Sequence, residues 1–177
     1  MRAGCRIGGG LVSAAAVLAL AGCGNAEPSV VAYVGNDRIT QAQFDRAVSG
    51  VSSTLQEGQQ VSRDAVANAL IHGVLAEQIA ADRKVQVSDS QREKFLQSTE
   101  LAVLLGNPDA RQVAYDIADQ QLVAEKVGAE AYVAAVRDRS VTLNPRFGVL
   151  DPAQKLITSA EQTGSLSKPA PLAAPNP

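Results

Sequence analysis

The sequence predicts a mainly α-helical domain, a bundle of about five helices with a small sheet, and three observations support this. Residues 40–139 contain four capped helix starts, each followed by apolar residues at steps of three or four. Strand-like β-branched segments stand at both ends of this region. Aromatic residues form only 3% of the chain and Trp is absent, so the core must be aliphatic. Such a core suits close-packed helices better than an aromatic-lined ligand pocket.

The first 22 residues have the layout of an export signal. Arg2 and Arg6 form a positive start, and residues 7–21 form a small apolar segment before Gly22 and Cys23. This run of about 15 residues is shorter than the roughly 20 that a spanning helix needs, which disfavours the alternative of a transmembrane segment. We expect residues 1–22 to be removed, which changes the formal charge from −2 to −4 because Arg2 and Arg6 leave with them.

The end of this signal, Leu20-Ala21-Gly22-Cys23, resembles the lipobox of bacterial lipoproteins. The resemblance implies that Cys23 becomes the first residue of the mature chain and carries covalent lipid such as palmitate. An ordinary signal peptide with an incidental cysteine is the alternative. Because two or more acyl chains anchor a protein stably, we expect a lipid-anchored protein on the extracytoplasmic face of the cell membrane. Cys5 leaves with the signal, so no thiol remains for a disulfide or a metal.

Composition divides the remainder into a tether, one domain and a tail. Residues 23–29 form a short polar tether, residues 30–158 form the folded domain, and residues 159–177 are rich in Pro and Ala. The tail has too little apolar surface to offset its ordering entropy, so we expect disorder there. No basic block occurs anywhere in the chain, which argues against a nucleic acid partner.

The domain begins with a strand, a turn and a capped helix. Residues 30–34 are β-branched and aromatic, and Gly35-Asn36 can form a tight turn. Thr40 and Gln43 make a capping box, and the apolar stripe that follows predicts a helix ending at Gly58 as its C-cap.

Three further capping signals place the other helices. Ser62 begins a helix running to about Lys84, and residues 88–91 form a second capping box. Asn107-Pro108 restarts the chain as N-cap and first helical residue. Gly128 should end that helix, and residues 129–139 should form a fifth. Residues 141–150 are again strand-like, although Pro145 restricts them to an edge or a bulge.

Two segments more than 100 residues apart resemble the SurA N-terminal domain, found in the SurA, PrsA and trigger-factor group of folding chaperones. The first is VAYVGNDRITQAQFDRAV, although Gly35-Asn36 replaces the Asn-Gly order typical of that group's turn. The second, residues 141–148 (VTLNPRFG), is similar to the V-x-V-N-P-R-[FY]-G segment of small SurA-like lipoproteins. The resemblance implies that the second segment pairs with the first strand and closes the sheet. The matching residues of the first segment are Val31, Ala32, Val34, Ile39, Thr40 and Phe44.

The resemblance also implies a function. We expect an ATP-independent chaperone, a holdase that binds unfolded or newly secreted polypeptides, without the parvulin prolyl isomerase domain of longer relatives. The alternative is an envelope adaptor lipoprotein that binds one specific folded partner. We expect peptide contact from apolar side chains that exceed what is needed to cover one helix face. Core packing is the alternative role for these residues. These candidates are Phe95, Leu101, Val103, Leu104 and Leu105.

The sequence offers no constellation for catalysis, metal or cofactor binding. The one histidine, His72, lies inside a helix pattern, where a structural role is expected. Carboxylates at Asp116, Asp119, Glu125 and Glu130 fall on helix faces expected to be solvated. An enzyme is therefore the least supported of the function classes.

Overall fold

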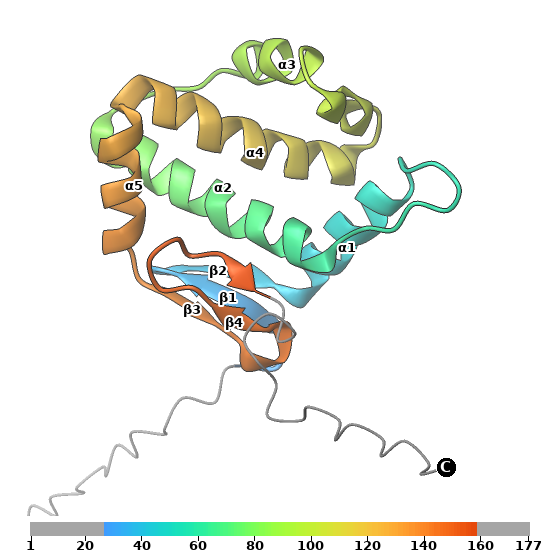
Figure 1. Cartoon of the computed structure of the whole chain (residues 1–177), viewed down its shortest axis with the longest axis horizontal. Helices are drawn as coiled ribbons and strands as arrows, with labels where there is room; N and C mark the ends of the chain where they lie inside the picture. The colour runs from blue at the N-terminus through green and yellow to red at the C-terminus, as the bar shows by residue number, and fades with distance from the viewer. Residues whose placement is uncertain (1–26, 159–177) are drawn as a thin grey trace, which may run out of the picture.

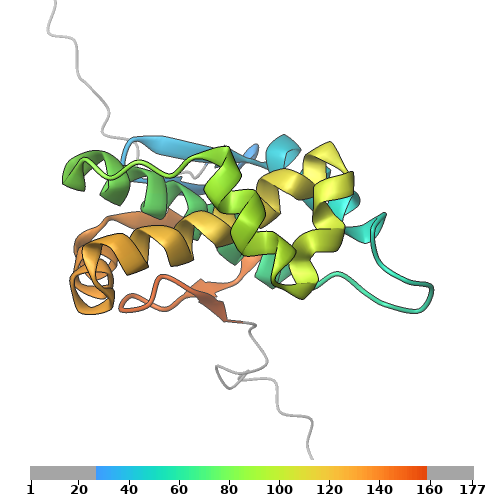
Figure 2. The same ribbon diagram turned by 90° about the horizontal axis from the view of Figure 1, so that it is seen from above.

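The computed structural model describes residues 27–158, which stack in layers of helices on a small sheet (Figure 1). Helix α2 packs against the sheet, α4 packs on α2, and α3 lies on the far side of α4, while α1 and α5 flank this stack (Figures 1 and 2). The predicted mainly α fold, with about five helices and a small closing sheet, is confirmed. The α-helices are α1 (Gln41–Ser52), α2 (Arg63–Arg83), α3 (Asp89–Gln97), α4 (Pro108–Val127) and α5 (Ala129–Asp138).

The sheet joins the two ends of the domain. Strand β1 (Val30–Val34) lies between β2 (Asp37–Thr40) and β3 (Val141–Leu143), antiparallel to both. In this register Ala32 pairs with Ile39 on one side and with Leu143 on the other. The side chains of β1 are almost all buried, as its apolar character on both faces predicts. The expected pairing of the N-terminal hairpin strand with a C-terminal strand is therefore confirmed.

The segment after β3 is fastened to the start of the domain by Asn144. The register of β1 and β2 shifts between Val30 and Ala32, and the carbonyls of Val30 and Val31 turn to Asn144. The Asn144 side-chain amide donates to the Val30 oxygen at 2.9 Å, and its backbone N–H donates to the Val31 oxygen at 2.8 Å. Asn144 is only 5% exposed, so these bonds close the sheet from inside.

Residues 141–150 do not form one continuous strand. After β3, a 3₁₀ turn η2 (Pro145–Phe147) interrupts the segment, and β4 (Val149–Leu150) pairs instead with β5 (Ile157–Thr158). Proline lacks the N–H that a strand ladder requires, and its fixed φ favours this turn. The turn places Phe147 edge-on against Phe44 of α1, with ring centroids 5.6 Å apart.

The helix starts follow the capping signals. Thr40 and Gln43 form the predicted capping box, with the Gln43 side chain 2.8 Å from the Thr40 backbone nitrogen. Ser62, the Ser88–Gln91 box and Asn107 before Pro108 also cap helices as predicted. These caps set where each helix enters the stack.

The predicted end of the first helix is wrong. Helix α1 ends at Ser52, and Gly58 lies in the following loop with a φ of +88°. The hydroxyls of Ser53 and Thr54 donate to the carbonyls of Gly50 and Val51, at 2.7 and 2.8 Å. These bonds compete for the carbonyls that another helical turn would use.

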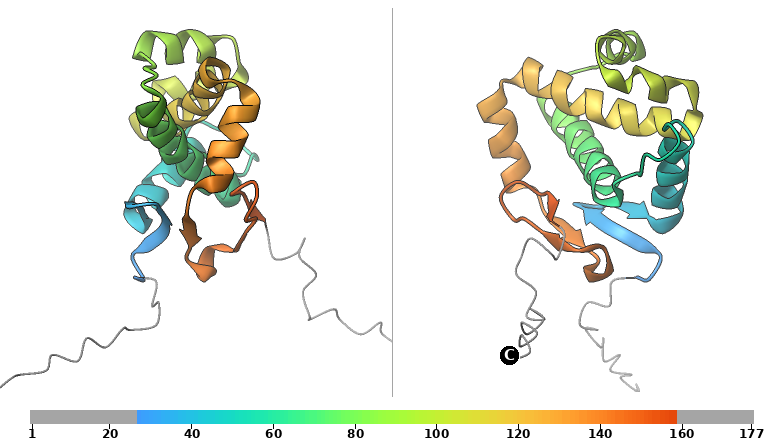
Figure 3. Two further views of the ribbon diagram at one scale, coloured as in Figure 1. Left: turned by 90° about the vertical axis from the view of Figure 1, so that its left-hand side faces the viewer. Right: turned by 45° about the vertical axis from the view of Figure 1, so that its right-hand side comes forward.

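The core divides into two clusters. The larger one lies between the sheet, α1, α2, α4 and α5, and includes Phe44, Ile71, Leu75 and Ile79. The smaller one fills the space under α3 and the 3₁₀ helix η1 (Glu100–Gly106). Both ends of the described chain lie on the sheet side of the molecule, away from the smaller cluster (Figure 3).

Candidate functional site

Helix α2 lies very close to the Asp116 side chain of α4 at Gly73. A Cβ atom built on Gly73 would lie 2.5 Å from the Cβ of Asp116 on α4, so no larger residue fits without movement. Glycine therefore lets α4 cross directly over α2. The crossing lays the Asp116 side chain across α2 and opens a depression on each side of it.

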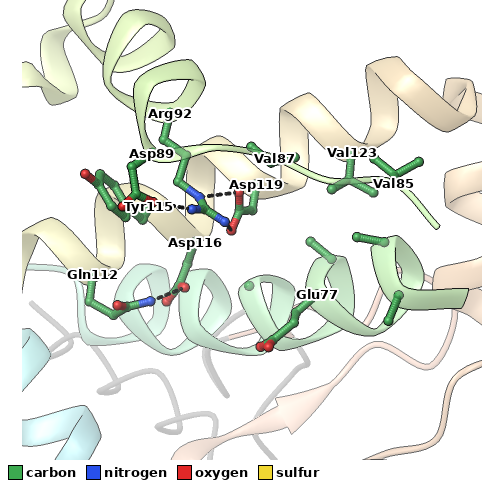
Figure 4. A pocket seen from close by; sticks show the side chains of 14 residues that line it. Glu77, Val85, Val87, Asp89, Arg92, Gln112, Tyr115, Asp116, Asp119 and Val123 are labelled. Carbon is green, nitrogen blue, oxygen red and sulfur yellow. Dashed lines mark hydrogen bonds and ion pairs between the residues drawn. The ribbon is translucent and has the colours of Figure 1, made fainter. Parts of the chain in front are cut away.

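Two adjoining cavities of about 610 and 460 Å³ occupy these depressions. Both are lined by Gly73, Glu77, Gln112 and Asp116, so they adjoin at these residues, and the pair is here called the α2–α4 groove. The larger cavity extends towards α3, as Figure 4 shows, and the smaller extends towards α1 and β2. Each cavity alone is within the size range of ligand sites.

One wall of the larger cavity is the segment that links α2 to α3. Val85 and Val87 of this segment face the cavity, opposite Val123 of α4 (Figure 4). The Lys126 ammonium donates to the carbonyl oxygen of Gln86 at 2.6 Å, which ties the segment to α4. This part of the groove is therefore apolar and fixed at its back.

A half-buried ion pair forms the next part of the wall. Arg92 of α3 donates to both carboxylate oxygens of Asp119, from Nε at 2.7 Å and from Nη2 at 3.0 Å. Its third nitrogen donates to Asp89, and its guanidinium lies 5.5 Å from the centre of the Tyr115 ring. The hydrogen bond that Arg92 donates to Asp119 is the largest cause that raises the pKa of Arg92. A forked pair of this kind fixes α3 against α4.

Asp116, at the middle of the groove, forms no ion pair with a cation within the described residues. Its Oδ1 accepts from the Gln112 amide at 2.9 Å, which favours the ionised form. Burial is the stronger effect, however, and with the nearby carboxylates of Asp119 and Glu77 it raises the pKa of Asp116 to about 7. The centre of the groove can therefore carry a neutral or a charged carboxyl near neutral pH.

These positions correct one prediction from the sequence. Asp119 was expected on a solvated helix face, but its side chain is only 17% exposed, and Asp116 is likewise withdrawn from solvent against Gly73. Asp119 faces Arg92 of α3, and Asp116 faces Gly73 of α2. Glu125 and Glu130 are exposed, as predicted.

The apolar residues proposed for peptide contact gather elsewhere, around η1. Leu104 is 5% exposed and belongs to the smaller core cluster, while Phe95, Leu101 and Leu105 are half-buried against it. Val103, on the same 3₁₀ helix, is 56% exposed. The structure thus brings four of the five together, and Val103 is the one that is largely exposed.

A third cavity, of about 520 Å³, lies between α2, α4, α5 and residues 153–156. Sequence reasoning missed it, because its walls come from four separate segments. It is lined by His72, which is 6% exposed, and burial lowers the pKa of this side chain. His72 is therefore a neutral imidazole in the core.

The remaining sequence predictions about sites concern metal, membrane and lipid. Within residues 27–158, no group of three or more His, Cys, Asp or Glu side chains is arranged to hold a metal ion. In the same part of the chain, no helix is both long and apolar enough to span a membrane. Cys23, the predicted lipidation site, and the tail at 159–177 lie outside the described residues. Comparisons with protein-family models, curated proteins and solved structures found no match for this chain.

Proposed function

We propose that this protein is an exported, lipid-anchored holdase of the SurA-like group, which binds unfolded segments of polypeptides without ATP. The observation that carries the proposal is the α2–α4 groove. It is open to solvent and comprises two adjoining cavities, and it combines partly apolar walls with a carboxyl at its centre. Such a surface suits an extended chain, whose side chains alternate between apolar and polar.

The closure of the sheet supports membership of the SurA-like group. The two sequence segments that carry the resemblance contact each other residue by residue, through Asn144 at β1 and through Phe147 against Phe44. The N-P-R-F motif therefore has a physical role, because Asn144 accepts the Arg146 N–H while bonding the first strand. The helices stand as an insertion between two paired strands.

Apolar and charged parts of the groove suggest what a bound segment contains. Val85, Val87 and Val123 line one end, and Ile39 and other apolar side chains line the other. A client segment with apolar residues flanking a basic one would complement this order. The domain would hold such segments near the membrane, with Cys23 as its anchor.

Client aggregation tests the proposal. We expect the protein, at up to equimolar amounts, to delay aggregation of a chemically reduced client without added nucleotide. Ala81 is exposed on α2 and lines the groove. Ala81→Arg should therefore place a long cation in the groove and weaken protection of the client against aggregation. Ala42 is exposed on α1 and lines none of the described cavities, so Ala42→Arg is the matched control and should protect normally.

Three results would argue against this function. If client aggregation is unchanged at equimolar protein, the holdase proposal is wrong. If one folded envelope protein co-purifies with the chain while generic clients remain unprotected, the adaptor alternative is favoured. If Cys23→Ser leaves the protein attached to membranes, Cys23 is not the anchor.

A further inference from the structure

The cavity under α5 has features that the holdase proposal does not use. Its walls are formed by Val133 and Val136 of α5, Ala124 of α4 and Leu156 of the turn before β5. With about 520 Å³ and predominantly apolar side chains, it has the size and character of a small-molecule site. Val133 is 53% exposed, so this wall reaches solvent.

Two residues that line this cavity carry three buried polar atoms without a well-formed hydrogen bond in the described part of the chain. The hydroxyl of Tyr132 makes no hydrogen bond within residues 27–158, and neither ring nitrogen of His72 makes one of good geometry there, although the backbone of Lys155 and Gln154 approaches the His72 ring. His72 and Tyr132 are 6% and 5% exposed, so neither relies on bulk water. Buried polar groups in folded proteins are nearly always hydrogen-bonded, and leaving one unpaired costs stability. His72 of α2 and Tyr132 of α5 line the same cavity. This arrangement points to a bound group that forms hydrogen bonds with both side chains.

The protonation states of the two residues define what this group must offer. Burial raises the pKa of Tyr132 to about 12, so its hydroxyl keeps its proton and can donate. Burial lowers the pKa of His72, although the backbone of Lys155 and Gln154 offsets part of this shift, and the neutral ring still carries one N–H. The two side chains therefore present two donors, and the second ring nitrogen of His72 is an acceptor.

The charges around the cavity select among possible head groups. No Asp or Glu is among its lining residues, whereas Arg137 of α5 is exposed and lines it. A carboxylate only accepts hydrogen bonds, so it matches two donors and a nearby cation better than an ammonium or an alcohol does. We propose that this cavity binds a small amphiphile with an apolar chain and a carboxylate head, which accepts hydrogen bonds from Tyr132 and His72. This site is separate from the α2–α4 groove and does not depend on the holdase proposal.

Binding of decanoate to the full chain carrying Cys23→Ser tests this site, because no covalent lipid can then compete. Calorimetric titration below the concentration at which decanoate forms micelles should show saturable binding of one molecule per chain. Decan-1-ol should bind more weakly, and decylammonium weakest, because of Arg137. Absence of saturable decanoate binding, or equal affinity for the three head groups, would overturn the proposal.

Two variants distinguish a ligand contact from a structural role. Tyr132→Phe removes one donor and should weaken decanoate about tenfold, the effect of one charge-assisted hydrogen bond. It should not lower the unfolding temperature of the free protein, since it also removes an unpaired hydroxyl. Tyr115→Phe is the control: its hydroxyl bonds Glu93 on another face, and decanoate affinity should stay unchanged.

Val133→Glu provides a second test on an exposed position, where the fold is not at risk. A carboxylate at this wall should repel decanoate and reverse the preference between decanoate and decylammonium. If Tyr132→Phe and Val133→Glu both bind decanoate as tightly as the unaltered chain does, the cavity is not its site and the proposal fails.

Discussion

Replacing Asp116 with Asn should stabilise the protein, and increasingly so as the pH rises. Burial raises the pKa of this carboxyl from the ordinary 3.8 to about 7. At pH 3 it is protonated in both folded and unfolded chains, so it has no effect on the free energy of unfolding. As the pH rises from about 4 to 7, the unfolded chain releases this proton first, and the folded chain loses relative stability.

The size of the expected stability gain follows from the same two pKa values. A pKa of about 7 against 3.8 corresponds to about 4 kcal/mol when both forms are ionised. Partial solvation of the groove reduces this energy. We therefore expect Asp116→Asn to raise the free energy of unfolding by about 2–4 kcal/mol at pH 8 and by almost nothing at pH 3. The substitution keeps an oxygen that can accept the Gln112 amide, so only the ionisation is removed.

Urea unfolding of both proteins from pH 3 to 8 measures this difference. Asp138→Asn, at the exposed end of α5, removes the same formal charge away from the groove and serves as the control. If the stability gain of Asp116→Asn is constant with pH, or if the control shows the same rising gain, burial of Asp116 does not control its ionisation.

Four further substitutions test the packing of the domain by urea unfolding. Gly50→Ala should cost about 2 kcal/mol, because a Cβ at this site would lie 2.7 Å from the Ala110 backbone nitrogen, and overpacking exceeds the gain in helix propensity. Gly106→Ala, with open space around it, should be neutral, and equal losses at both sites would contradict this. Asn144→Ala should cost about 2–3 kcal/mol by leaving the buried Val30 carbonyl unpaired, and a loss below about 0.5 kcal/mol would show that water replaces it. Arg92→Ala should cost about 2 kcal/mol, because the half-buried Asp119 loses its forked partner. High salt should not abolish this loss, as it would for an exposed pair.

Local signals in the sequence were sufficient to place the helices. A capping box such as Thr40 with Gln43 uses hydrogen bonds within four residues, so the pattern contains the whole interaction. The end of α1 was missed because Ser53 and Thr54 compete for carbonyls in a way that the apolar stripe does not reveal. The pairing of β1 with β3 was available only through the resemblance, since no local pattern links residues 110 positions apart.

The candidate sites depended on contacts that sequence spacing cannot show. Asp116 enters the groove because Gly73, 43 positions earlier, lets two helices touch. Without that crossing, the i,i+3 spacing of Asp116 and Asp119 describes an ordinary exposed helix face. In the same way, His72 and Tyr132 meet only because α5 folds back onto α2. The single histidine of the sequence, which lies in a helix pattern without an evident partner, was the one signal that could have indicated a site there.

The position of β1 in the middle of the sheet has a consequence for folding order. Its hairpin partner β2 follows within a few residues, but β3 is about 110 residues further along the chain. During synthesis or export from the N-terminus, β1 therefore has one unsatisfied edge until nearly the whole domain has emerged. Closure by Asn144 and β3 must be a late event, and any intermediate before it exposes an edge strand that can pair with another chain. A protein proposed to hold unfolded polypeptides would itself pass through such a stage.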